Sequence, residues 1–137
     1  MRIIAAMLAD AAHVQGGKLY VLGGGFDTIT TRQIPSIHRN LTLVLVAEIE
    51  PDERHRDLDL AIRLVDEDGQ TLPVGAKGKL RVRSHAQLPP GAVSTVPLVS
   101  PFHNIRFPEP KGYAFAVEHD DEEIARVSFR VVLAEST

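Results

Sequence analysis

The sequence predicts an all-β domain of two packed antiparallel sheets, a β-sandwich of about nine strands. The first observation is that apolar residues recur at every second position between Tyr113 and Leu133, on both sides of an acidic run. Because successive side chains of a strand point to opposite faces, this period of two predicts a hairpin with one buried face. The second observation is that most of the chain repeats the pattern in short segments bounded by Gly, Pro and Asp. No segment predicts a helix with comparable strength.

The composition is that of a globular protein. With 137 residues, of which 44% are apolar and 24% charged, the chain suits a single domain over residues 1–137. A net charge of −3 gives no reason to expect nucleic acid as a partner. No run approaches the roughly 18–20 apolar residues that span a bilayer, so we expect no membrane association. The absence of cysteine excludes thiol chemistry and fits a cytoplasmic location.

The first predicted strand covers residues 2–13, although helix is an alternative there. Ala, Met and Leu favour helix, and Ile4, Leu8 and Ala11 would share one helical face. The segment that follows, residues 15–18, contains two glycines and reads as a hairpin turn. We therefore choose a strand and an N-terminal hairpin. The other predicted strands are residues 19–22, 26–30, 41–50, 58–65, 80–82, 96–107, 113–117 and 125–133.

Residues 41–50 form the longest uninterrupted alternation. Their odd-numbered positions are apolar, and Val44 and Val46 make the opposite face half apolar as well. A strand with this composition is usually covered on both sides. If the N-terminal hairpin does not cover the outer face, we expect a second copy to do so and predict a homodimer. Further members of this apolar outer face would be Val65, Ile124 and Val132.

Turn residues separate the later strands. Residues 66–69 read DEDG, in which Asp can bond its own backbone and Gly accepts positive φ. Pro97 and Pro101 cannot donate to a ladder, which places residues 96–107 at a sheet edge or across a bulge. Tyr113 follows a Pro- and Gly-containing corner, where immunoglobulin-like sandwiches place a tyrosine bonded to upstream backbone.

Several segments together resemble an uncharacterised bacterial family of unknown function. Residues 9–12 read ADAA and residues 17–29 read GKLYVLGGGFDTI, followed by the DEDG turn of residues 66–69. The likeness continues with FP at residues 107–108 and GYAFAV at residues 112–117. It covers nearly the whole chain and rests on turn and core residues. The resemblance implies a small β-sandwich and brings no catalytic or cofactor-binding residue.

A basic stripe is the best candidate binding feature. Its members are spaced by two, so they would project from one face of one strand: Lys79, Arg81, Arg83 and His85. Such a row of donors could bind an anionic small molecule or an acidic partner. Alternatively, these residues have a structural role: their charges prevent an edge strand from pairing with another chain, or they are cross-strand partners of Asp59 and its neighbours. The structural alternative is the more common case.

Other candidates for chemistry are weaker. The six histidines show none of the local spacings of a metal site, so we expect no metal and no cofactor. Residues 66–69 resemble the start of a calcium loop, but Lys77 stands where a bidentate Glu is required. Residues 119–123 concentrate four carboxylates, which we interpret as a solvated turn rather than a weak calcium site. No Gly-x-Ser-x-Gly elbow is present.

Three functional hypotheses follow from these observations. The first is a non-enzymatic interaction or assembly module that acts as a homo-oligomer. The second is a ligand-binding sandwich that uses the basic stripe. The third, a hydrolase, requires His, Asp and Glu residues from distant segments to converge in one pocket.

Overall fold

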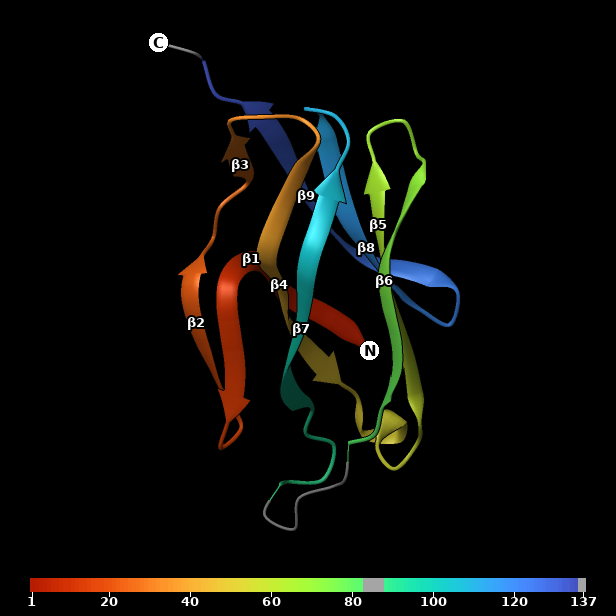
Figure 1. The fold of residues 1–137 in the computed structure, drawn as a ribbon. Coiled ribbons are helices and arrows are strands. Elements are labelled where there is room, and N and C mark those ends of the chain that lie inside the picture. Colours follow the sequence, from red (N-terminus) through yellow and green to blue (C-terminus); the bar gives the residue numbers. More distant parts are fainter. Residues whose placement is uncertain (83–87, 136–137) are drawn as a thin grey trace.

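The computed structural model describes residues 1–82 and 88–135. Nearly all of these residues belong to strands or to the turns between them. The elements are β1 (Arg2–Gln15), β2 (Lys18–Gly24), β3 (Thr28–Thr31), β4 (Ser36–Ile49), the 3₁₀ helix η1 (Pro51–Glu53), β5 (Leu58–Asp66), β6 (Thr71–Leu80), β7 (Ser94–Phe107), β8 (Gly112–His119) and β9 (Glu122–Leu133). The strands form a four-stranded sheet, β2-β1-β4-β7, and a five-stranded sheet, β3-β9-β8-β5-β6 (Figure 1). The predicted all-β sandwich is confirmed.

The N-terminal segment is a strand and a hairpin, as predicted. Gln15 faces Lys18 across a two-residue turn in which Gly16 and Gly17 have φ of 59° and 72°. Positive φ at both positions is the type I′ geometry that suits a tight hairpin. The first half of β1 pairs with β4 and the second half with β2, and Ala9 belongs to both ladders. Figure 1 shows β1 bending where it leaves β4, so that the hairpin extends beside the sandwich.

Two details of the ladders differ from the prediction. The pair formed by β3 and β9 is parallel, whereas all pairs were expected to be antiparallel. The prediction that a strand begins at Leu80 is wrong, because β6 begins at Thr71 and ends at Leu80. Pro73, Gly75 and Gly78 weaken the alternation of β6, which explains why the sequence pattern did not indicate a strand.

The core lies between the two sheets. Leucines at alternate positions of β4 meet aromatic residues of β7, β8 and β9, and these side chains are at most 8% exposed: Leu41, Leu43, Leu45, Phe102, Phe107, Tyr113, Phe115 and Phe129. The rings of Phe115 and Phe129 stack with centroids 5.8 Å apart. Stacked contacts of this kind add to the stabilisation that comes from burying apolar area.

The outer face of β4 is largely covered within the single chain, as expected for a strand that is apolar on both sides. Val44 is only 1% exposed and Val65 only 6%, while Val46, Ile124 and Val132 are half-buried. The single chain therefore already covers most of this surface. β1 flanks Val44 through Met7 on one side and β7 flanks it through Val99 on the other, so this face gives no reason to expect a second copy. The described part of the chain contains no helix that could cross a lipid bilayer.

Candidate functional site

Only two members of the basic stripe, Lys79 and Arg81, lie among the described residues. Lys79 lies in β6 and is exposed. Arg81 lies just beyond β6, and its Nη2 donates a 2.8 Å hydrogen bond to the carbonyl oxygen of His55, so it ties down a neighbouring loop. The two remaining members, Arg83 and His85, lie outside the described residues. The same alternation includes Lys77, which the sequence analysis missed although its spacing from Lys79 is the same.

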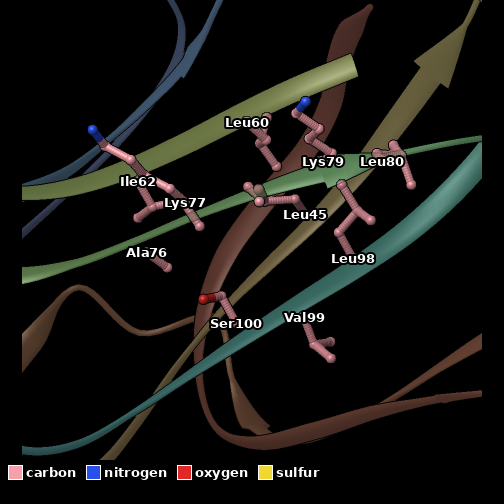
Figure 2. A pocket seen from close by; sticks show the side chains of 11 residues that line it. Leu45, Leu60, Ile62, Ala76, Lys77, Lys79, Leu80, Leu98, Val99 and Ser100 are labelled. Carbon is pink, nitrogen blue, oxygen red and sulfur yellow. The ribbon is translucent and has the colours of Figure 1, made fainter. Parts of the chain in front are cut away.

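An apolar cleft lies between β6 and β7, where the two sheets end on the same side of the sandwich. Its volume is about 220 Å³. Figure 2 shows the residues that line it: Leu45, Leu60, Ile62, Ala76, Lys77, Gly78, Lys79, Leu80, Leu98, Val99 and Ser100. Leu45 and Ile62 are buried core residues, whereas Leu60, Leu80 and Leu98 are only half-buried. Core leucines are therefore reachable from solvent along this cleft.

Small residues on the inner side of β6 create the cleft. The inward positions of this strand carry Leu72, Val74, Ala76, Gly78 and Leu80. Residues with little or no side chain thus occupy two consecutive inward positions. A Cβ atom added to Gly78 would meet no atom within 4 Å, so this position faces open space. The sequence signal was present in the Ala-x-Gly spacing, but it becomes visible only once β6 is known to be a strand.

The cations beside the cleft are Lys77 and Lys79, both of which are exposed. Lys77 and Lys79 make no ion pair with any residue in the described part of the chain. Asp59 is paired with Lys79 in the β5–β6 register, but its carboxylate interacts with His119 instead. In Figure 2 both lysine side chains leave β6 on the side away from Leu98. The structure thus places Lys79 opposite Asp59 without an ion pair between them, whereas Arg81 of the stripe lies 3.8 Å from Asp57, a neighbour of Asp59.

A second cluster joins β5 to the tip of the β8–β9 hairpin. One ligand atom each of Asp59, His119 and Asp120 lies within 4.8 Å of the others, the one such group among residues 1–82 and 88–135. His119 Nδ1 lies 2.7 Å from the carbonyl oxygen of Asp59, which can only accept, so Nδ1 carries a proton. Its Nε2 lies 3.3 Å from Asp120 Oδ2. The Asp59 carbonyl thus orients the His119 ring so that its second nitrogen faces the Asp120 carboxylate.

The two carboxyl groups of this cluster influence each other's titration. The hydrogen bond from the Asp120 carboxyl lowers the pKa of Asp59, and the same interaction raises the pKa of Asp120. One nitrogen and two oxygens are donors that a divalent transition metal accepts. However, the side chains of Asp59 and Asp120 are 51% and 75% exposed, and the site is an open hairpin tip rather than a pocket. The sequence shows the acidic run of residues 119–123 but contains no signal that joins it to Asp59, which is 60 positions from His119.

The free edges of the two sheets differ in their protection. The edge strands are β2, β7, β3 and β6. Pro97 and Pro101 interrupt the edge of β7, and β6 carries Pro73 with its two exposed lysines, while β3 has only four residues. Prolines, lysines and short length are the devices that prevent strand addition at an edge. The sequence of β2, Lys-Leu-Tyr-Val-Leu-Gly-Gly, has none of these devices beyond its first residue.

The hairpin that carries β2 is apolar on both faces. Leu22 is 73% exposed and Tyr20 48%, and the ring of Tyr20 stacks on His13 with centroids 5.0 Å apart. Val14 and Val21 are exposed on the other face. A hollow of about 500 Å³ runs along the two strands between residues 11–13 and 19–22. This hairpin therefore concentrates exposed apolar surface next to an unprotected strand edge.

Comparisons with known proteins identify a family but no activity. A family model described as a family of unknown function (DUF6941) matches residues 4–132. No curated protein matches the chain. A β-glucuronidase from glycoside hydrolase family 2 is similar in structure with a TM-score of 0.35 and 14% identity, over 72% of this chain and 11% of that protein. The alkylpurine DNA glycosylase AlkC of Pseudomonas fluorescens, bound to DNA containing an abasic site analog, is similar with a TM-score of 0.38 and 15% identity. This match covers 93% of this chain and 30% of that protein.

The chain spans less than a third of either structural relative. The family match, in contrast, extends from the first half of β1 to the last residues of β9 and so includes both sheets. The protein is therefore a β-sandwich that belongs to the family of unknown function DUF6941.

Proposed function

We propose that the protein is a non-enzymatic assembly module that forms a homodimer by pairing β2 with β2 of a second copy. The observation that carries this proposal is that β2 is an apolar edge strand without the guards that protect β3, β6 and β7. An exposed apolar strand edge is a template for pairing with another chain. Because two copies offer the same strand, an antiparallel pair around a two-fold axis is self-complementary.

The turn geometry determines which backbone groups of β2 are free. A two-residue turn makes Gln15 and Lys18 a hydrogen-bonded pair of the hairpin. Hydrogen-bonded and non-bonded positions alternate along an antiparallel ladder, so the N–H and C=O groups of Leu19 and Val21 point to the free edge. Pairing at these positions would join the two four-stranded sheets into one continuous sheet across the dimer.

Side chains on the hairpin add apolar burial to this backbone pairing. Tyr20 and Leu22 lie on one face beside His13, and Val21 lies on the opposite face beside Val14. A partner strand would cover parts of both faces at once. Burial is worth about 25 cal/mol for each Å² of apolar area removed from water, so Leu22 is the largest single contributor by exposure.

Sedimentation velocity at micromolar concentration tests the proposal. We expect a species of twice the chain mass of 15.0 kDa. Val21→Pro removes an edge N–H without touching the β1 ladder, and Leu22→Lys places a charge in the interface, so both variants should sediment as monomers. Ile37→Lys is the control, because Ile37 is 64% exposed but lies on β4, and it should remain dimeric. A wild-type protein that is monomeric throughout this range would refute the proposal.

A further inference from the structure

We infer that the cleft between β6 and β7 binds a small amphipathic anion, a short alkyl or aromatic carboxylate. Its apolar part would fill the space beside Gly78, and its carboxylate would pair with Lys77 or Lys79. The inference is independent of the β2 edge, because the cleft lies at the opposite side of the four-stranded sheet.

The lining indicates the apolar part of the ligand. Leu60, Leu80 and Leu98 are half-buried side chains at inward positions, so water in the cleft contacts mainly hydrocarbon. Among the described residues of the lining, the Ser100 hydroxyl is the one polar side-chain group besides the two lysines. Displacing water from such a surface favours an apolar guest, since the water there lacks the two to four polar partners that stabilise ordered water.

The volume limits the size of that guest. The cleft of about 220 Å³ is smaller than the sites of roughly 300–1,000 Å³ that take drug-sized ligands. It is larger than an engineered apolar cavity of about 150 Å³ that takes benzene. An apolar group of roughly six to eight non-hydrogen atoms therefore fits, as in a C6 alkyl chain or a phenyl ring.

Charge selects a carboxylate rather than an amine as the polar end. Lys77 and Lys79 flank Gly78 in sequence, touch the cleft, and have no carboxylate partner among the described residues. β6 is an edge strand, so no described strand is hydrogen-bonded to its free side. The flexible four-carbon stem of either lysine can therefore swing over this side and bring the ammonium group to the mouth of the cleft.

Titration with hexanoate, followed by ¹H–¹⁵N correlation spectra, tests the inference; hexanol and hexylamine serve as uncharged and cationic probes of the same length. We expect saturable shifts of the Ala76, Gly78 and Leu98 amide signals with hexanoate, weaker binding of hexanol and none of hexylamine. The Gly78→Val variant fills the cleft and should abolish the shifts. Its melting temperature should not fall, because a Cβ at this position meets open space. A folded Gly78→Val protein that still binds hexanoate would overturn the inference.

The double variant Lys77→Met, Lys79→Met separates charge from shape. It keeps the apolar stems, so hexanol should bind as in the wild type while hexanoate binding weakens at least about fivefold. Equal binding of hexanoate and hexylamine to the wild type, or shifts that do not saturate, would also contradict the assignment. The Leu22→Lys variant should bind hexanoate normally, which distinguishes failure of the cleft from failure of the proposed dimer.

Discussion

The hydroxyl of Tyr113 donates a 2.6 Å hydrogen bond to the carbonyl oxygen of Glu109, four residues upstream. The tyrosine is 2% exposed, and its ring packs on Phe107 with centroids 4.9 Å apart. One side chain thus fixes the corner between β7 and β8, where the chain crosses from one sheet to the other, and also belongs to the core. The tyrosine corner expected from the sequence is confirmed.

Removal of this hydroxyl should lower stability measurably. Tyr113→Phe keeps the ring but leaves a carbonyl without its partner, so we expect a loss of about 1 kcal/mol in the free energy of unfolding. Tyr20→Phe is the matched control, because Tyr20 is 48% exposed and should tolerate the change. Urea denaturation of both variants measures the difference. Equal stability of the two variants would show that the corner hydrogen bond contributes nothing.

Asp66 should make stability depend on pH. Its Oδ1 accepts hydrogen bonds from the N–H groups of Gln70 (2.9 Å) and Asp68 (3.0 Å), and Lys111 Nζ lies 3.1 Å from its Oδ2. The Gln70 bond and the lysine hold the pKa of Asp66 below its ordinary value. A lowered pKa stabilises the fold above the ordinary value of about 4, and this contribution is lost as the pH falls through the lowered pKa.

We therefore expect Asp66→Asn to be less stable than the wild type at pH 7, and the difference to shrink at about pH 3 and below. Asp68→Asn is the control, since that side chain is 70% exposed and contacts the same lysine. Its effect should be small at both pH values. Urea denaturation between pH 7 and about pH 3 measures these differences. A stability difference between Asp66→Asn and the wild type that did not change with pH would contradict the role of Asp66.

Two glycines at the C-terminal end of β2 allow the cost of backbone strain to be distinguished from that of steric overlap. Gly23 and Gly25 have φ of 62° and 85°, a region that costs other residues about 1–2 kcal/mol. A Cβ on Gly25 would meet nothing within 4 Å, whereas one on Gly23 would overlap the Asp10 carboxylate. Gly23→Ala should therefore destabilise more than Gly25→Ala, and adding Asp10→Ala should remove the excess. Thermal unfolding of the three variants checks this order; equal losses for the first two would contradict it.

Dimer formation should make thermal stability depend on concentration. A partner that binds only the folded chain stabilises it by mass action. Between about 1 and 100 μM we expect the melting temperature of the wild type to rise, and that of Leu22→Lys to stay constant. Differential scanning fluorimetry over a dilution series measures both. A rise in both proteins would point to contacts other than β2.

The sequence predicted those elements whose information is local. β4, β8 and β9 show clear alternation, and the two glycines between Gln15 and Lys18 specify the first hairpin. The pairing of strands that are distant in the sequence could not be predicted, because nothing in residues 28–31 indicates a parallel partner about a hundred positions away.

The candidate sites depend on the same long-range information. Asp59 meets His119 only through the β5–β8 ladder, and the cleft exists only because Gly78 faces inward in a strand whose alternation is weak. Lys79 was identified from its spacing, but the cavity beside it was not. A row of charged residues can be recognised from its spacing in the sequence. A small residue such as Gly78 indicates a cleft only when the structure shows that it faces inward between two sheets.

Because β1 pairs with both β2 and β4, it connects the exposed hairpin to the interior of the molecule. The same fourteen-residue strand contributes Leu8, fully buried, and ends in the turn that leads to β2. A force applied to the hairpin is transmitted along one uninterrupted backbone to the leucines of β4. Tension at this hairpin would therefore reach the centre of the sandwich directly, because no loop separates the hairpin from the buried part of β1.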